Sequence, residues 1–214
     1  MDFTLFCGIP EQPVLPKDPS SDSFSLVSPA GSDIWRVPAT AGGRDEFSGP
    51  IYATPLPLNS FRKASVTVSA DFKTPYAQGG LVLLLPGTVR RSQNKDQTTF
   101  ESSPQQWIKT GIEYENNAFF ASVVAANPYA DWSLAPIGVS KATFDMEKKH
   151  GALWIFVTTP GGQRIPLREL TWVFEEDDDR EVWIGVAACM PKGDASGNGG
   201  KLSVHFEDFK VVTA

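Results

Sequence analysis

The chain has 214 residues, 19 basic and 25 acidic side chains, a net charge of −6 and 41% hydrophobic residues. The apolar fraction excludes wholesale disorder, and the acidic balance argues against a binder of nucleic acid or of anionic membranes. The chain also has 18 Gly, 17 Pro, six Trp and 14 Phe. Frequent turns together with many aromatic residues favour a β-rich domain over a helical one.

Residues 1–7 contain neither a basic segment nor a long apolar segment, so we expect no signal peptide. Cys7 and Cys189 are too few for a disulfide framework, and no Asn-x-Ser/Thr acceptor occurs. These features predict a cytoplasmic protein with free thiols. The longest apolar run, residues 81–86, is far shorter than the roughly 20 residues that cross a bilayer.

Four prolines between positions 10 and 19 predict an extended N-terminal arm over residues 1–23, packed on one β-sandwich domain of residues 24–214. Apolar and polar residues alternate over 66–72, which predicts a half-buried strand. Residues 80–85 are continuously apolar, as is typical of a central strand covered on both faces.

The second half of the chain continues this strand-and-turn pattern. A tight-turn signal, Asn116-Asn117, predicts a hairpin that joins residues 107–114 to 118–126. In the closing strand, residues 201–212, the apolar parity changes near Asp208, which predicts a β-bulge. Charged residues 175–180 and glycine-rich residues 194–200 are expected to be loops. About 11 to 13 strands result, the spacing expected of an antiparallel sandwich.

Several kinds of active site are excluded by what the sequence lacks. The two histidines, His150 and His205, do not provide the cluster that a catalytic triad or a zinc site needs. No phosphate-binding or dinucleotide-binding fingerprint occurs. The best carboxylate pair for glycoside hydrolysis is Glu113 with Glu115, but Glu115 falls at a predicted turn. We therefore expect no cofactor, no metal and no glycosidase, metalloenzyme or triad chemistry.

Five ordered motifs are specific when taken together. They are YAQGGL at 76–81, WIKTGIE at 107–113, SVV at 122–124, DWS at 131–133 and VHFEDF at 204–209. Over residues 24–212 they resemble a concanavalin-A-like family of unassigned function that includes the fungal regulation-of-enolase proteins. Ala77, Gly79 and Ala130 depart from that family's usual Asp, Ala and Ser.

The resemblance implies an all-β, antiparallel jelly-roll sandwich of the concanavalin-A-like, lectin or glucanase type. It further implies relatives in fungal biosynthetic clusters that look like hetero-Diels-Alder cyclases. Such relatives would join a tropolone quinone methide to a terpene alkene without a cofactor, as part of secondary metabolism.

Strand alternation predicts a polar and aromatic surface in the concave groove of the sandwich, suited to a small-molecule substrate. Its candidate catalytic residues, which would polarise a carbonyl oxygen, are Lys109, Arg168 and Gln78. Its candidate substrate-binding residues are Tyr76, Trp107, Glu113, Asp131, Trp132 and Trp183.

Three interpretations of this surface remain open. In the first, the surface is the active site of a cofactor-independent cyclase or pericyclase that works by proximity and orientation. In the second, it is the binding site of a non-catalytic carbohydrate-binding module. Alternatively, it belongs to a regulatory domain that acts on a metabolic enzyme, and the polar network only braces the groove. Val14 and Leu15 in the arm offer an apolar surface for such a partner or for a homodimer.

Overall fold

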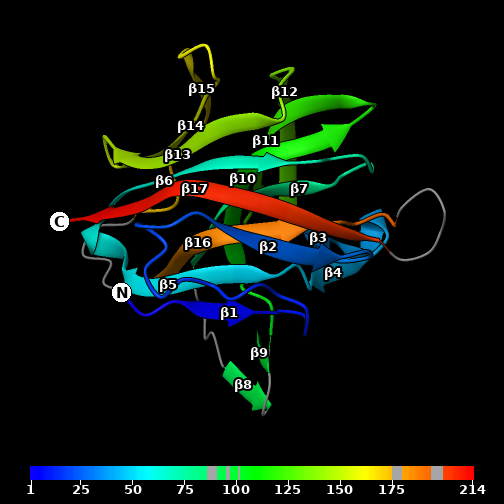
Figure 1. Ribbon diagram of the computed structural model, residues 1–214. Helices are drawn as coiled ribbons and strands as arrows, with labels where there is room; N and C mark the ends of the chain where they lie inside the picture. Colours follow the sequence, from blue (N-terminus) through cyan, green and yellow to red (C-terminus); the bar gives the residue numbers. More distant parts are fainter. Residues whose placement is uncertain (86–90, 95–96, 101, 175–179, 194–199) are drawn as a thin grey trace.

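Short segments of alternating or continuous apolar residues, separated by turn residues, form the strands of the computed structural model (Figure 1). The structure describes residues 1–85, 91–94, 97–100, 102–174, 180–193 and 200–214. The loops predicted at 175–180 and 194–200 lie outside these residues, apart from positions 180 and 200. The helices of the described part are the 3-10 turns η1 (Ala39–Ala41) and η2 (Leu58–Ser60). No helix in the described ranges has the length and apolar character needed to span a membrane.

Two large sheets form the sandwich. The larger sheet has the order β12-β11-β10-β7-β16-β5-β1-β9-β8, and the smaller has the order β15-β14-β13-β6-β17-β2. The larger sheet contains β1 (Thr4–Phe6), β5 (Ile51–Pro57), β7 (Gln78–Leu85), β8 (Arg91–Asn94), β9 (Gln97–Phe100), β10 (Gln106–Glu115), β11 (Ala118–Ala126), β12 (Ala130–Pro136) and β16 (Glu181–Cys189). The smaller contains β2 (Phe24–Pro29), β6 (Phe61–Ala70), β13 (Lys141–Lys149), β14 (Ala152–Thr158), β15 (Arg164–Leu170) and β17 (Lys201–Thr213). The strand pairs are antiparallel except for β1 with β9.

A separate hairpin, β3 (Ile34–Val37) with β4 (Arg44–Phe47), pairs only within itself among the described strands. It packs on the face of the larger sheet that points away from the smaller sheet. A second apolar cluster fills the space between them and includes Ile34 of the hairpin and Val82, Trp107 and Trp183 of the sheet. The hairpin therefore covers part of a sheet face that alternation alone would leave open.

The main core lies between the two sheets. Inward residues of the larger sheet, such as Leu83 and Ile108, meet Val66 and Phe144 of the smaller sheet, and all four side chains are fully buried. Each such burial contributes about 1.5–3 kcal/mol, so this layer is the main source of stability. Other core members are Phe61, Phe72, Phe206 and Phe209.

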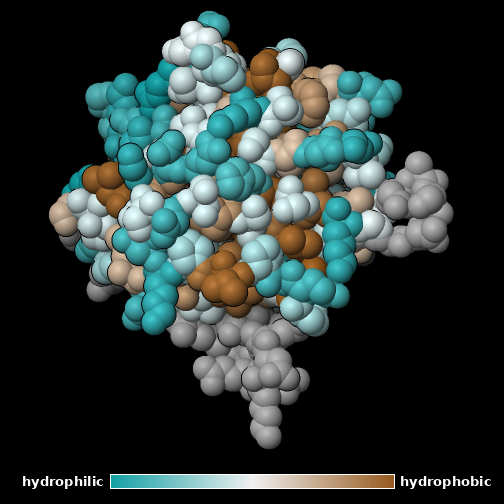
Figure 2. Space-filling model, in the orientation of Figure 1, coloured by the Kyte–Doolittle hydropathy of each residue, from teal (hydrophilic) through white to brown (hydrophobic). Residues whose placement is uncertain are grey.

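The outer face of the smaller sheet is polar. It faces the viewer in Figure 1, and hydrophilic side chains predominate over its upper part in Figure 2. Lys63 and Arg164 pair there with Asp145 at 2.9 and 3.2 Å. The arrangement is that of a solvated sheet face.

Local predictions from turn chemistry are confirmed. The hairpin between β10 and β11 turns at Asn116 and Asn117, whose φ angles are 48° and 58°. In β17 the register shifts between Glu207 and Lys210, and Asp208 has a φ of 52°. The turn was visible in the sequence from its Asn-Asn pair, and the bulge from the change of apolar parity.

Within the predicted N-terminal arm, Thr4–Phe6 form β1 and pair with β5. Further along, the Gln12 side-chain amide donates to the carbonyl of Val27 at 2.6 Å and accepts from its N–H at 2.9 Å. The Tyr52 hydroxyl donates to the carbonyl of Pro16. These hydrogen bonds attach the segment to both sheets of the sandwich.

Candidate functional site

A cavity of about 270 Å³ lies on the outer face of the larger sheet, beside the β3–β4 hairpin. Strand register assembles its floor. Lys109 of β10 lies opposite Val124 of β11, and Glu113 lies opposite Gln78 of β7. Because residues paired across strands point to the same face, these four side chains share one surface.

Three aromatic rings form the walls of the cavity. Trp132 lies 6.4 Å from the Trp35 ring, with an interplanar angle of 88°, and 6.2 Å from the Tyr76 ring, with an angle of 70°. Trp132 is 38% exposed, so its ring is available to a ligand. Tyr76, with a φ of 66°, precedes β7, and its carbonyl accepts a hydrogen bond from the Gln78 amide at 3.0 Å.

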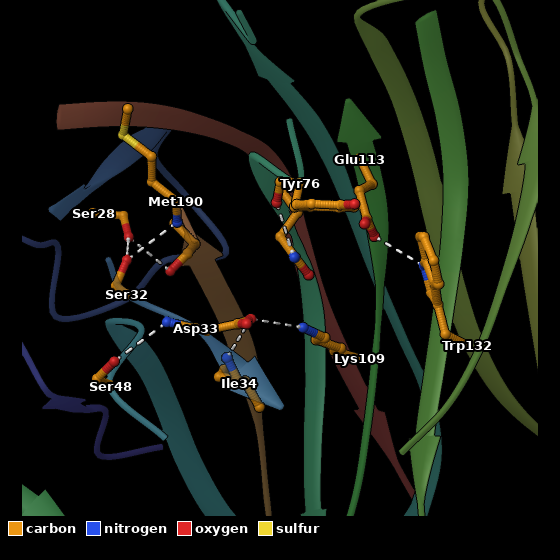
Figure 3. A network of polar contacts seen from close by, with 12 residues as sticks. Ser28, Ser32, Asp33, Ile34, Ser48, Tyr76, Lys109, Glu113, Trp132 and Met190 are labelled. Atoms are coloured by element: carbon orange, nitrogen blue, oxygen red, sulfur yellow. Dashed lines mark hydrogen bonds and ion pairs between the residues drawn. The ribbon is translucent and has the colours of Figure 1, made fainter. Parts of the chain in front are cut away.

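The carboxyl group of Glu113 lies on the floor and is buried. It accepts a hydrogen bond from Trp132 Nε1 at 3.3 Å (Figure 3). Burial raises the pKa of Glu113, and this effect exceeds the opposite effects of Lys109 and of hydrogen bonds from Ser122 and Trp132. A carboxyl group in such surroundings can donate a hydrogen bond when it is protonated.

Lys109 is buried beside the same cavity, with 7% of its surface exposed. Its Nζ lies 3.7 Å from Asp33 Oδ1, and no hydrogen bond within 3.5 Å joins it to any described residue. Asp33 also accepts from the N–H of Ile34 at 2.8 Å and pairs with Arg44 at 3.1 Å (Figure 3). The carboxylate is therefore well held, whereas the ammonium has unused donors.

Small residues form a recess of about 20 Å³ that shares Gln78 and Lys109 with the cavity. Gly111 lies opposite Gly80 on one side and Ser122 on the other. A Cβ at Gly111 would come within 1.9 Å of the carbonyl oxygen of Gly79, so the backbones of β7 and β10 require glycine there. The recess has room for one water-sized group.

Five predicted site residues come together at the cavity: Tyr76, Gln78, Lys109, Glu113 and Trp132. Four of them lie in β7, β10 and β12 of the larger sheet, and Tyr76 lies just before β7. The alternation argument predicted the shared face of Gln78, Lys109 and Glu113. Trp132, expected in a turn that caps the groove, instead lies in β12.

The placement of Trp107 and Trp183 in an open groove is wrong. Both are on the predicted face, but they are fully buried under the β3–β4 hairpin and the N-terminal strand. Phe47 packs on Trp107 with ring centroids 6.2 Å apart, and Phe6 packs on Trp183 at 5.0 Å. The covering segments are distant in sequence, so no local pattern announced them.

The placement of Arg168 and Asp131 on the groove surface is also wrong. Arg168 belongs to β15 of the smaller sheet and donates to the carbonyl of Asp131 at 3.1 Å and to Ser133. Asp131 alternates with Trp132 along β12, so it faces away from the cavity. The two residues brace the edges of the two sheets against each other.

The sequence analysis missed the other side of the cavity. Asp33, Trp35 and Arg44 come from the β3–β4 hairpin or the residue before it, and Pro191 and Lys192 follow β16. The apolar residues Ile34, Trp35 and Val37 were a weak strand signal. Nothing in it showed that the strand folds back over the larger sheet.

The two thiols are free, and Cys189 is buried. Burial raises the pKa of Cys189 to about 12 and that of Cys7 to about 11, so neither is an activated nucleophile. Within the described part of the chain, no group of three or more His, Cys, Asp or Glu side chains is placed to hold a metal ion.

Residues 11–214 match the family described as "Protein of unknown function (DUF1349)". The uncharacterized protein AN7484 of Emericella nidulans is 37% identical over 201 residues, which cover 92% of this chain and 88% of that protein. A functionally unknown protein from Saccharomyces cerevisiae has a TM-score of 0.70 and 21% identity, covering 100% of this chain and 97% of that one.

A GH43 protein and an alginate lyase have a similar fold over about nine-tenths of this chain. The GH43 protein BlXynB of Bacillus licheniformis, as a K247S mutant, has a TM-score of 0.58 and 11% identity over 90% of this chain and 33% of that one. An alginate lyase from Klebsiella pneumoniae has a TM-score of 0.52 and 7% identity, over 91% and 82% of the two chains. At these identities the likeness shows the fold alone, an all-β antiparallel sandwich of the concanavalin-A-like type.

Proposed function

Because the chain belongs to the DUF1349 family, which is described as of unknown function, we propose its function from the cavity. It binds one small ring-shaped organic molecule between Trp35, Trp132 and Tyr76, over the floor formed by Lys109 and Glu113. The observation that carries this proposal is Lys109, a largely buried side chain that lines the cavity and makes no hydrogen bond within 3.5 Å to a described residue.

Burying ionisable groups is costly, and the fold gains little from these two. A buried polar group without a partner costs about 1–3 kcal/mol, and a charged group costs more. Lys109 and Glu113 both lie on the floor, and no ion pair within 4.0 Å joins them among the described residues. Ionisable groups in such surroundings concentrate at binding and catalytic sites.

The size of the cavity limits the ligand. Typical small-molecule pockets measure about 300–1,000 Å³. At about 270 Å³, this cavity suits one ring with a few substituents. Trp35 of the β3–β4 hairpin forms one of its walls. The proposal therefore favours a compact ligand over a long polysaccharide chain.

Lys109 also favours a second candidate, cofactor-free cycloaddition in fungal secondary metabolism. An ammonium on the lining of a cavity can stabilise negative charge on a carbonyl oxygen, and Gln78 lines the same cavity. Arg168, at the sandwich edge, takes no part in this version. Since the volume suits one reactant, the quinone methide would occupy the cavity and the alkene would lie at its mouth against Trp132.

Saturation-transfer NMR with a library of single-ring aromatic and sugar compounds tests the binding proposal. We expect compounds that bind the wild-type protein to lose at least about tenfold in affinity in Trp132→Ala. Trp154→Ala is the matched control, because Trp154 is half-buried on the outer face of the smaller sheet, stacked on Phe156. Thermal unfolding confirms that both variants are folded. The absence of any bound compound, or equal binding to Trp132→Ala, would refute the proposal.

A further inference from the structure

The ammonium of Lys109 makes no hydrogen bond to a described residue. Its Nζ lies 5.8 Å from the centre of the Trp107 ring, and the described carboxylate within 4.0 Å of it is Asp33, whose Oδ1 at 3.7 Å is beyond hydrogen-bonding distance. The Lys109 side chain is 9% exposed, so bulk water has little access to it. An acceptor oxygen supplied by a ligand would complete its coordination.

The counter-charge that Asp33 offers is already shared. Its Oδ1 accepts the N–H of Ile34 at 2.8 Å, and its Oδ2 pairs with Arg44 at 3.1 Å. Lys192 adds a further cation to the lining. The lining thus contains three cationic side chains, Lys109, Arg44 and Lys192. Its two acidic side chains are Asp33 and Glu113.

The charges of the lining do not balance. Among the described residues, three cationic side chains line the cavity with only two carboxyl groups, those of Asp33 and Glu113, so an excess of positive charge remains even when both carboxyl groups are ionised. A neutral ligand leaves this excess uncompensated, and an anionic ligand neutralises it.

One residue, Val124, separates Lys109 from Trp132 on the face of the sheet that lines the cavity. Lys109 lies opposite Val124, and Val124 lies opposite Trp132, so Lys109 and Trp132 are two strands apart. Their backbones are therefore about 9–10 Å apart, which is two strand spacings. A carboxylate at Lys109 would thus place an attached six-membered ring over Val124, with its edge or face against Trp132.

We propose that the ligand is a six-membered ring that carries a carboxylate, and that Lys109 binds this carboxylate. The inference rests on the proposed small-molecule function and names its ligand class. Both an aromatic acid and a sugar acid have this chemistry, because either ring can pack on Trp132.

Calorimetric titration with two matched pairs tests the inference and separates the two sources. The pairs are 4-hydroxybenzoate with 4-hydroxybenzamide, and D-glucuronate with D-glucose. We expect the acid of one pair to bind the wild-type protein at least about tenfold more tightly than its neutral partner. The pair that shows this preference identifies the source.

Variants show whether Lys109 is responsible. Lys109→Met should abolish the preference for the acid, whereas Lys210→Met, an exposed position on β17, should retain it. Urea unfolding of each variant shows that it is folded. A preference that survives in Lys109→Met overturns the assignment of Lys109.

The remaining outcomes separate this inference from the proposed function. Equal affinity for the acid and the neutral compound overturns the carboxylate inference and leaves small-molecule binding in place. If no member of either pair binds, the carboxylate inference is overturned, and the fragment screen with Trp132→Ala decides the proposed function independently.

Discussion

Replacing Lys109 by methionine should leave the stability of the fold nearly unchanged. At 3.7 Å from Asp33 and an effective dielectric constant of about 20, the Lys109–Asp33 attraction is about 4 kcal/mol. Removing a buried ammonium from water costs several kcal/mol, so the two contributions nearly cancel. Methionine has similar length and fills the space without a charge. We therefore expect the free energy of unfolding to change by less than about 1 kcal/mol, in either direction.

Replacing the partner carboxylate, Asp33, should lower the stability of the fold. Asp33→Asn removes the carboxylate that faces both Lys109 and Arg44 and leaves the buried ammonium without a counter-ion. Breaking a buried pair in this way typically costs about 3–5 kcal/mol. We therefore expect a loss of about 3 kcal/mol in the free energy of unfolding.

Urea unfolding monitored by far-UV circular dichroism measures both changes. The midpoint of Lys109→Met should match that of the wild type with the same m-value, while Asp33→Asn unfolds at a lower urea concentration. A loss above about 3 kcal/mol in Lys109→Met would show that Lys109 supports the fold. The argument that it is retained for a ligand would then fail.

Two other predictions concern the same floor. Glu113 gains stability from its raised folded-state pKa only when it is protonated, so this contribution is present at low pH and is lost as the pH rises through the folded pKa. Glu113→Gln should therefore unfold at a higher temperature than the wild type at about pH 8, and at a similar temperature near pH 4. Equal thermal midpoints of the variant and the wild type at both pH values would contradict a raised pKa of Glu113. For the cycloaddition candidate, chromatography of a tropolone quinone methide with a terpene alkene should show product that depends on the protein and is lost in Lys109→Met; an unchanged product profile would sink it.

The sandwich was predictable because its signals are local. Alternation, continuous apolar runs and turn residues such as Asn116 and Asn117 act over a few positions, and they set strand identity and register. The same locality placed Lys109 and Glu113 correctly, since they are two strand steps apart on β10 and face the same way. The motifs that carried the resemblance then supplied the type of sandwich.

The rest of the site depends on contacts between distant segments. Alternation assigned Trp107 to the correct face but could not show that Phe47 covers it. For Arg168, alternation predicts on which side of its strand the side chain lies, but it cannot predict which sheet contains that strand. Trp35 was missed because its role arises only when the β3–β4 hairpin folds back over the larger sheet.

The β3–β4 hairpin has a consequence for how ligand choice can diverge among relatives. Its strands pair only with each other in the described structure, so the hydrogen-bonded ladders of the two large sheets do not depend on it. Ile34 anchors it in the apolar cluster, whereas Trp35 and Arg44 face the cavity. Changes at these two positions would therefore alter the lining of the cavity without altering a strand pair of the two large sheets.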